Sequence, residues 1–351
     1  MFVVTATPHR ISFFGGGTDM PDFYRRTHGS VLSVTINRFV YVTVKPHGEL
    51  FNEPYRLNYS ETELVHNLDE VRNQIARETM RKLGTPAPIY ISTIADMPSG
   101  SGLGSSSSFA VGLAQALSTL QGRRMQPAEI AEFASHIEID VLKKPIGKQD
   151  QYNAAIGGLN HFTFMPSGNV AVTAVRTPFD TIEAMFEHFM LLWTGVMRSA
   201  EDVLKEQRGN INDRMTELTS MRDSADEAVK MFESPAFNIQ EFGKLLHEGW
   251  VLKRKLAKSI SNSAFDEAYD KARSVGAYGG KICGAGAGGF LLLCVPPEKK
   301  QAVREALPHM KELKIGYEPH GTRVLFPNSH MTQSMQNRPH TWPLDANAAI
   351  A

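Results

Sequence analysis

The chain has 351 residues, which is enough for two domains, or for one large domain, with a sizeable core. Its 37 basic and 37 acidic residues cancel, and this neutrality argues against nucleic acid or an anionic membrane as the main partner. The N-terminal segment lacks the pattern of a signal peptide, and no apolar run approaches the ~20 residues of a membrane span, so we expect a cytoplasmic protein.

Strand signals dominate the first part of the chain. Alternating, β-rich stretches predict strands at residues 2–6, 30–36, 40–44 and 89–94. Residues 63–82 predict a helix that ends at Gly84 and Pro86.

A glycine-dense turn, Phe13–Asp19, follows the first strand. Its consecutive glycines would let the backbone pack closely against a ligand. Thr18 and Asp19 offer short polar groups for sugar or alcohol hydroxyls, and Arg10 supplies a fixed positive charge just before the turn. An ordinary β-turn with a surface Asp explains this segment equally well.

A second glycine-rich segment, Pro98–Ser108, lies between the strand predicted at 89–94 and an apolar stretch at 109–117 that predicts a buried helix. Such a turn leaves backbone N–H groups free at the positive end of the helix dipole, where they bind polyanions. Glycines allow close approach, and the serines add hydroxyls for phosphate or for a metal ion. A flexible Gly/Ser linker is the alternative, but linkers do not lie between a strand and an apolar helix.

Two common nucleotide-binding patterns do not fit the chain. Gly280-Lys281 lacks the preceding glycine and the following Ser or Thr of a P-loop. Gly284–Gly289 matches the dinucleotide pattern, but a strand predicted at 290–295 follows where that fold needs a helix. Hydride transfer is therefore not expected.

A helix predicted from Pro127 carries Glu138 at the edge of its apolar face. A carboxylate in this place can reach inward to a divalent cation. Asp150, in the glycine-led loop that follows, could accept the proton of an attacking hydroxyl. A solvated Glu and a turn-forming Asp are the alternatives, and each is the commoner case for a single residue.

The composition changes after residue 177, where we place a domain boundary. The expected units are residues 1–177, residues 178–327 and a loosely held tail at 328–351. The first unit ends in a hairpin predicted at 160–164 and 170–175.

The second unit mixes helices with strands, which predicts a layered sheet with helices on one side. The helices are predicted at 201–233, 239–260 and 297–307, and the strands at 290–295, 313–318 and 322–326. Arg198, near the start of the first of these helices, could clamp an anionic group, although an exposed arginine fits as well.

Together these segments resemble the GHMP small-molecule kinases, the superfamily of galactokinase, homoserine kinase, mevalonate kinase and phosphomevalonate kinase. The three signature segments appear in the family's order, at Pro8–Asp19, Pro98–Ser108 and Lys281–Phe290. Within the superfamily the chain is similar to the D-glycero-D-manno-heptose 7-phosphate kinases. The segments that carry this likeness are Gly15–Asp19, Gly147–Gln151, Thr194-Gly195 with Arg198, and Leu246–Trp250.

The resemblance implies an α+β, two-domain fold, whose first domain is like domain 2 of ribosomal protein S5 and whose second is ferredoxin-like. It implies that Asp150 is the catalytic aspartate and that Arg10 orients it. Ser106 and Glu138 would hold Mg²⁺. The residues implied for the phosphates of ATP are Gly100, Ser101, Gly102, Leu103, Gly104, Ser105 and Ser106. Those implied for the sugar are Gly17, Thr18, Asp19, Arg198, Gly284 and Gly286.

The implied function is ATP-dependent phosphorylation of the anomeric hydroxyl of D-glycero-D-manno-heptose 7-phosphate, in the biosynthesis of nucleotide-activated heptose for a surface polysaccharide. Candidates to hold the substrate's own phosphate are Arg25, Arg26, Arg38 and Arg198. The alternatives are a kinase for another sugar or sugar phosphate, such as fucose, and a GHMP-fold regulator that binds ligand without catalysis. The expected partners are ATP and a small sugar phosphate, and a homodimer stays open.

Overall fold

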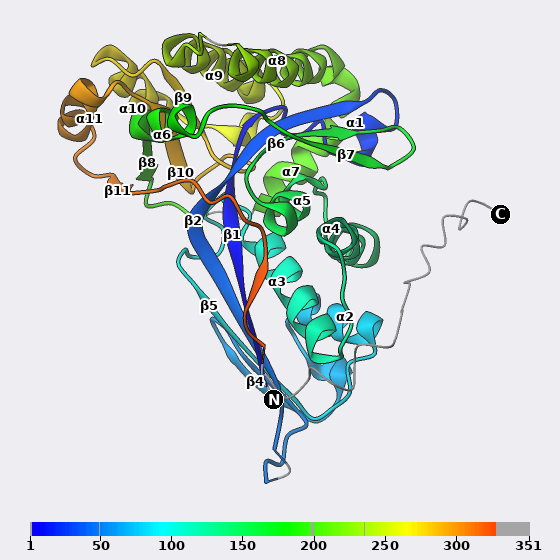
Figure 1. The fold of residues 1–351 in the computed structure, drawn as a ribbon. Helices are drawn as coiled ribbons and strands as arrows, with labels where there is room; N and C mark the ends of the chain where they lie inside the picture. The colour runs from blue at the N-terminus through cyan, green and yellow to red at the C-terminus, as the bar shows by residue number, and fades with distance from the viewer. Residues whose placement is uncertain (1, 49, 198–199, 235, 328–351) are drawn as a thin grey trace.

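The computed structural model describes residues 2–48, 50–197, 200–234 and 236–327 of the chain. These residues form two β-sheets with helices packed on them, so the predicted α+β class is confirmed (Figure 1). None of the described helices has both the length and the apolar character needed to cross a membrane. The predicted loose tail at 328–351 lies outside the described residues.

The elements follow one another along the chain as strands, α-helices and short helical segments. The strands are β1 (Val3–Phe14), β2 (Gly29–Pro46), β3 (Tyr55–Asn58), β4 (Thr62–Val65), β5 (Ile89–Ala95), β6 (Leu159–Phe164), β7 (Val170–Ala174), β8 (Phe189–Trp193), β9 (Gly279–Ile282), β10 (Phe290–Cys294), β11 (Lys311–Leu313) and β12 (Arg323–Pro327). The α-helices are α1 (Pro21–Tyr24), α2 (Gln74–Leu83), α3 (Ser105–Leu120), α4 (Pro127–Ser135), α5 (Gln149–Ile156), α6 (Phe179–His188), α7 (Ala200–Gly209), α8 (Met215–Glu233), α9 (Ile239–Arg254), α10 (Ser263–Ser274) and α11 (Lys300–Ala306). The short segments are η1 (Leu68–Glu70), the π-helix η2 (His136–Val141), η3 (Ile211–Arg214), η4 (Lys258–Ile260) and η5 (Pro297–Lys299).

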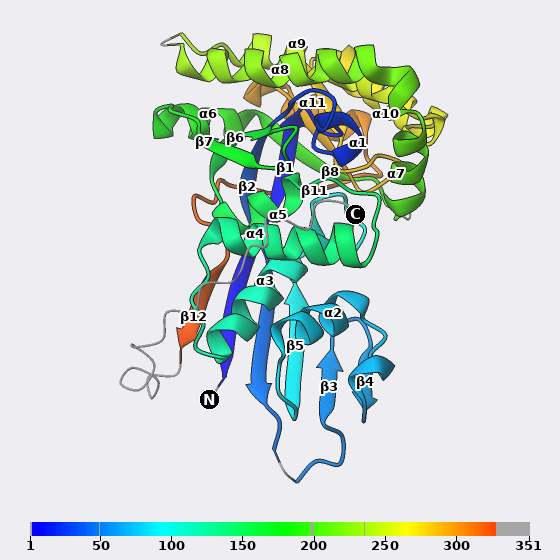
Figure 2. The same ribbon diagram turned by 90° about the vertical axis from the view of Figure 1, so that its right-hand side faces the viewer.

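The first sheet is built on the long antiparallel pair of β1 and β2. Its strand order is β12-β1-β2-β5-β3-β4, and β6 and β7 extend it beside the N-terminal part of β2. Helix α3 packs along β1 and β2, with α2 and α4 next to it (Figure 2). The core between this sheet and α3 includes Val42, Val44, Val111, Leu113 and Leu117. The apolar stretch at 109–117 is therefore a buried helix, as predicted.

The second sheet is antiparallel, with the strand order β11-β8-β10-β9. This is the fourth, first, third and second strand of the unit in chain order, which is the ferredoxin-like arrangement that the resemblance implied. Neighbouring residues of β8 enter different cores, Leu191 on one face of the sheet and Leu192 on the other. The same holds for Leu292 and Leu293 of β10. Both cores contain helix residues, such as Met185 of α6 in one and Phe265 of α10 in the other, so the prediction of helices on one side of this sheet is wrong. Burial on both faces explains why these strands are continuous apolar runs.

The end of β1 nearest the glycine turn packs against the second sheet. Phe13 lies 5.4 Å from Phe189 of β8 and 5.4 Å from Phe242 of α9, between ring centroids. The Nζ atom of Lys281 in β9 donates to the carbonyl oxygen of Phe13 at 3.0 Å. One core therefore joins segments from both sides of residue 177, and it brings the glycine turn beside the loop after β9. The domain boundary itself stays a prediction.

The helix predicted at residues 63–82 is wrong in its first half. Residues 62–65 form strand β4, and α2 begins only after Asn73. The buried Glu63 carboxylate accepts the backbone N–H groups of Arg72 at 2.6 Å and Asn73 at 3.0 Å. The Asn73 side chain then caps α2. The local sequence pattern does not show whether a glutamate accepts hydrogen bonds from residues further along the chain, as Glu63 does, or lies on the surface of a helix.

Strand β1 is longer than predicted, and the strands predicted at 30–36 and 40–44 are one strand, β2. The register of β1 against β2 shifts between Pro8 and His9, where the proline has no N–H for the ladder. Pairing resumes after this irregularity. Arg10 is therefore presented by a regular strand and not by a loop.

Most of the remaining elements are of the predicted type, helix or strand, but begin or end at other residues than predicted. The hairpin is present as β6 and β7, and the strand after the last glycine segment as β10. The helices predicted at 201–233 and 239–260 are each interrupted, after Gly209 and after Arg254. The strand predicted at 313–318 is displaced to β11. The strand predicted at 322–326 is present as β12, but it pairs with β1 in the first sheet, so its assignment to the sheet of the second unit is wrong.

Candidate active site

A cleft of about 260 Å³ is lined by residues from both halves of the chain. The end of β1, the glycine turn, the loop before α3 and the start of α5 line it from the first half. Helices α7 and α9 and the loop after β9 line it from the second half. The predicted site residues that line it are Arg10, Gly17, Asp19, Gly100, Gly102, Gly104, Ser105, Ser106, Glu138, Asp150 and Gly284.

The glycine-rich loop leads directly into the first turn of α3. Gly100, Gly102 and Gly104 adopt left-handed backbone conformations, with φ of 74°, 80° and 80°. Gly104 is the N-cap of α3 and provides no side-chain cap, so the first N–H groups of the helix are available to a ligand. Ser101 and Leu103 are fully buried and do not line the cleft. What the loop offers to an anion is main-chain N–H groups and the hydroxyls of the first helical turn.

This loop packs backbone to backbone against the loop after β9. A Cβ atom on Gly102 would lie 2.7 Å from the carbonyl oxygen of Cys283, and one on Gly284 would lie 2.6 Å from the Cα atom of Gly102. Neither position therefore has room for a side chain. Ala287, in the same loop, has a φ of 64°, so alanine occupies a conformation that favours glycine.

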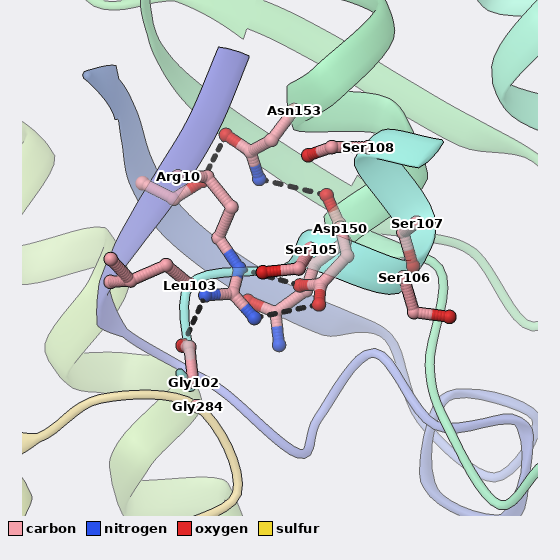
Figure 3. A network of polar contacts seen from close by, with 12 residues as sticks. Arg10, Gly102, Leu103, Ser105, Ser106, Ser107, Ser108, Asp150, Asn153 and Gly284 are labelled. Atoms are coloured by element: carbon pink, nitrogen blue, oxygen red, sulfur yellow. Dashed lines mark hydrogen bonds and ion pairs between the residues drawn. The ribbon is translucent and has the colours of Figure 1, made fainter. Parts of the chain in front are cut away.

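Arg10 and Asp150 form a bidentate ion pair in the cleft (Figure 3). Nε of Arg10 donates to Oδ1 of Asp150 and Nη2 donates to Oδ2, both at 2.6 Å. Nη1 donates to the carbonyl oxygen of Gly102 at 2.8 Å. Asp150 lies in the first turn of α5, not in the predicted loop. The side chain of Asp150 is 23% exposed and that of Arg10 is 5% exposed. The buried arginine therefore fixes the carboxylate, which remains accessible from the cleft.

Asp19 is a second, buried carboxylate of the same cleft. It accepts the N–H groups of Gly17 at 2.9 Å and Gln149 at 3.1 Å. Burial, together with the charge of Asp150, raises the pKa of Asp19 to about 6 against the opposing effect of these donors. Its charge therefore changes close to neutral pH.

Ser106 and Glu138 lie together, with 2.7 Å between Oγ and Oε1. Glu138 is fully buried on η2, and its Oε2 accepts from Ser107 at 2.8 Å and from Gln151 at 2.7 Å. The Nζ atom of Lys144 lies 3.0 Å from both Ser106 Oγ and Glu138 Oε1. In the described part of the chain no three His, Cys, Asp or Glu side chains form a metal-binding group. One hydroxyl and one carboxylate fit Mg²⁺, which takes few protein ligands and shares the rest with phosphates and water.

Two of the predicted substrate contacts, Thr18 and Gly286, do not line the cleft. Thr18 is fully buried, and its hydroxyl donates to the carbonyl oxygen of Gly15 at 2.7 Å, so it stabilises the turn. Gly286 packs against Ile260, whose carbonyl oxygen would lie 2.6 Å from an added Cβ. Arg198 lies outside the described residues.

Three of the four arginines proposed for the substrate's phosphate are also elsewhere. Arg25 and Arg26 are exposed, and Arg38 donates to the carbonyl oxygens of Asn37 and Lys314. None of these three arginines lines the cleft.

Two buried lysines that were not among the predicted site residues add positive charge to the cleft. Lys281 donates to the carbonyl oxygens of Ser12 at 2.8 Å and Phe13 at 3.0 Å. Lys253 donates to the carbonyl oxygen of Gly284. Burial lowers the pKa of Lys281 to about 8, and burial together with the charge of Lys281 lowers the pKa of Lys253. Within the described residues neither ammonium forms an ion pair with a carboxylate. A bound anion would therefore compensate the buried positive charge of both lysines.

A sequence signal for Lys253 exists in the spacing of α9. Leu246 and Trp250 are buried, and Lys253 follows them at the helical interval of the same face. A lysine on the apolar stripe of a helix must find a polar partner in the interior or line a cleft.

Two further residues bring unpaired polar atoms to the site. Ser12 Oγ and Gln149 Oε1 are buried, have no hydrogen-bond partner in the described structure, and belong to residues that line the cleft. Such atoms are uncommon in proteins and are candidates for contacts with ligand hydroxyls. Gln207 of α7 lines the cleft opposite Gly17, where its amide nitrogen would lie 2.3 Å from an added Cβ.

Comparison with known proteins places the chain in a family. It matches the descriptions "GHMP kinases N terminal domain" over residues 70–158 and "GHMP kinases C terminal" over residues 230–312. It is 32% identical over 318 residues to the D-glycero-alpha-D-manno-heptose 7-phosphate kinase of Campylobacter jejuni, which covers 86% of this chain and 92% of that protein. The chain belongs to the GHMP kinase family. The family predicted from the signature segments is thus confirmed, and this GHMP kinase is a phosphoryl-transferring enzyme.

This GHMP kinase is also similar to a solved structure and to a plant enzyme. A structure described as a D-glycero-D-manno-heptose 1-phosphate kinase from Bacteroides thetaiotaomicron aligns with a TM-score of 0.75 and 23% identity, covering 93% of this chain and 100% of that one. This alignment confirms the two-domain GHMP kinase fold. A bifunctional fucokinase/GDP-fucose pyrophosphorylase of Arabidopsis thaliana is 24% identical over 340 residues, which cover 88% of this chain and 31% of that protein.

Proposed function

We propose that this GHMP kinase phosphorylates the anomeric hydroxyl of D-glycero-D-manno-heptose 7-phosphate, with Mg·ATP as donor, to give the 1,7-bisphosphate and ADP. The similarity to the Campylobacter jejuni heptose 7-phosphate kinase carries the proposal, because it extends over 86% of the chain. We place the reaction in the cytoplasm, in the biosynthesis of nucleotide-activated heptose for a surface polysaccharide.

The phosphates of ATP would bind at the start of α3. Gly100, Gly102 and Gly104 bring the main chain close to them, and the helix dipole favours their negative charge. Lys253 and Lys281 add charge to the same cleft. Phosphoryl transfer depends mainly on positioning and on neutralising charge, and these groups supply both.

Ser106 and Glu138 would hold the magnesium ion. Bound there, the ion would supply positive charge to the phosphate oxygens of the nucleotide. The chain's own part is to present one hydroxyl and one carboxylate. Ser107 and Gln151 orient that carboxylate through its other oxygen.

Asp150 would align the sugar hydroxyl and accept its proton. The bidentate contact with Arg10 fixes the direction of the remaining lone pairs of the carboxylate. Because Arg10 also binds the Gly102 carbonyl, one guanidinium sets the spacing between Asp150 and the phosphate loop. Fixing two reacting groups at one distance is a large source of rate enhancement in group transfer.

The sugar would lie between Asp19 and Gly17 on one side and Gly284 on the other. Ser12 Oγ and Gln149 Oε1 would pair with its hydroxyl groups, since both atoms are buried and unpartnered. A substrate rich in hydroxyls satisfies these atoms, whereas an apolar one leaves them unpaired at a cost of about 1–3 kcal/mol each.

The pH dependence follows from the ionisation of Asp19. Its pKa is raised to about 6, so it gains a proton and loses its charge as the pH falls below that value, and one of its two oxygens then donates a hydrogen bond where it had accepted one. We therefore expect kcat/KM to fall by about tenfold per pH unit below pH 6. The substrate's own phosphate titrates in the same range, so Asp19→Asn is the control. A profile for this variant as steep as that of the parent would contradict the assignment.

Phosphorylation of another sugar, such as fucose, is the second candidate. The similarity to the plant fucokinase over 88% of the chain favours it. A non-catalytic regulator is less well supported, because Arg10, Glu138 and Asp150 all line one cleft with the phosphate loop.

A coupled assay of ADP release distinguishes these candidates. The panel contains heptose 7-phosphate, the unphosphorylated heptose, fucose, galactose and mannose 6-phosphate, each with Mg·ATP. We expect the highest kcat/KM for the heptose 7-phosphate, by at least about a hundredfold over the unphosphorylated heptose, since a lost charged contact costs about 3 kcal/mol. Turnover of fucose at a higher kcat/KM would overturn the proposal in favour of the second candidate.

A further inference from the structure

The ammonium group of Lys144 lies among the atoms assigned above to magnesium. Its Nζ is 3.0 Å from Ser106 Oγ and 3.0 Å from Glu138 Oε1, while these two oxygens are 2.7 Å from each other. We propose that Lys144 takes the place of the metal ion in the nucleotide-free enzyme, so that a divalent cation binds tightly only together with the nucleotide. The proposal rests on the proposed function in one respect, the use of a divalent cation at this pair.

The buried carboxylate of Glu138 needs a positively charged partner even when no metal ion is bound. The Glu138 carboxylate is fully buried, and the contacts of its Oε2 come from neutral donors, Ser107 and Gln151. A buried carboxylate without a positive partner is strongly destabilising. Lys144 provides the charge, and its ion pair with Glu138 is the one that the described structure gives this carboxylate.

The local chain conformation directs Lys144 to this pair. The π-helix η2 carries Glu138, and after it the backbone N–H of Lys144 returns to the Glu138 carbonyl oxygen at 3.0 Å. Lys143, between them, adopts a left-handed conformation with φ of 55°. Such a conformation is unfavourable for a residue other than glycine, and both it and π-helical turns are frequent at functional sites.

Lys144 is also able to leave. Its side chain is 27% exposed, and the residue lines the cleft, so the ammonium can move without disturbing the core. A lysine side chain is long and flexible and makes no fixed bidentate contact. On leaving Glu138, the ammonium stays in a cleft where the phosphates of the nucleotide provide new partners.

The test measures metal binding without sugar or nucleotide. Mn²⁺ is titrated into the protein at neutral pH, and the free ion is followed by electron paramagnetic resonance. Lys144→Met should bind Mn²⁺ roughly ten- to a hundredfold more tightly than the parent, the range in which neighbours of metal ligands act. Lys144→Arg, which keeps a cation, should bind as weakly as the parent.

Two controls assign the effect to this pair. Lys148→Met removes a lysine that pairs with Glu132 at 2.8 Å and should leave Mn²⁺ affinity unchanged. Adding Glu138→Gln to Lys144→Met should abolish the gain. Equal Mn²⁺ affinities of the parent and Lys144→Met would overturn the proposal, and should Lys144→Met not fold, Lys144→Gln carries the same expectation. Because no sugar is used, this outcome is independent of the substrate panel.

Discussion

Asp150→Asn is expected to lower kcat by roughly a thousandfold or more, with little change in the affinity for ATP. The amide keeps the size of the side chain but cannot accept a proton. It also turns an N–H donor toward the Arg10 guanidinium, which at present has two carboxylate oxygens at 2.6 Å. The alignment of the sugar hydroxyl and the position of Arg10 are therefore lost together. The rate of ADP release at saturating substrates measures the effect.

Asp140→Asn is the matched control for this variant. Asp140 lies on the π-helix η2, its side chain is 63% exposed, and it pairs with His136 outside the cleft. This variant should keep the kcat of the parent. A near-parental kcat for Asp150→Asn would contradict the role given to Asp150, whatever the control does.

Gly102→Ala is expected to abolish measurable ATP binding and to lower the free energy of unfolding by about 2–4 kcal/mol. Two physical effects add at this position. The backbone has a φ of 80°, which strains any residue with a Cβ atom, and that Cβ would lie 2.7 Å from the Cys283 carbonyl oxygen. Relief requires the phosphate loop to move away from the loop after β9, and this movement removes Arg10's contact with the Gly102 carbonyl. Chemical denaturation and calorimetric titration with ATP measure the two losses.

Gly168→Ala separates backbone strain from the steric clash. Gly168 has a φ of 93°, close to that of Gly102, but an added Cβ would meet no atom within 4 Å. This variant should lose about 1 kcal/mol of stability and keep full ATP affinity. If both variants were equally stable and both bound ATP, the close packing of the two loops would not matter for the site.

The sequence predicted those parts of the site that are formed by consecutive residues of the chain. The strand β5, the glycine-rich loop and the buried helix α3 follow one another within about thirty residues, and each has its own pattern of alternation, glycine or small apolar residues. The prediction of an anion-binding loop needed no knowledge of any other segment.

Contacts between distant segments were beyond such reasoning. Arg10 and Asp150 are 140 residues apart, and their association came from the family resemblance, not from any spacing. Thr18 was expected to face the sugar, but its hydroxyl is used by the turn that presents Asp19. Lys253 was missed, although its place on the apolar face of α9 was a usable signal. Burial and hydrogen-bond partners, which decide these cases, depend on the whole fold.

The chemical structure of the product shows whether a phosphoryl group passes from ATP to the anomeric oxygen of heptose 7-phosphate. The enzyme, Mg·ATP and D-glycero-D-manno-heptose 7-phosphate are incubated together and the product is analysed by ³¹P and ¹H nuclear magnetic resonance. We predict one new phosphate signal, coupled to the anomeric proton, that appears in step with ADP. A new phosphate coupled to any other sugar proton would contradict the proposed function. So would the absence of transfer to this heptose by an enzyme that turns over an unphosphorylated sugar.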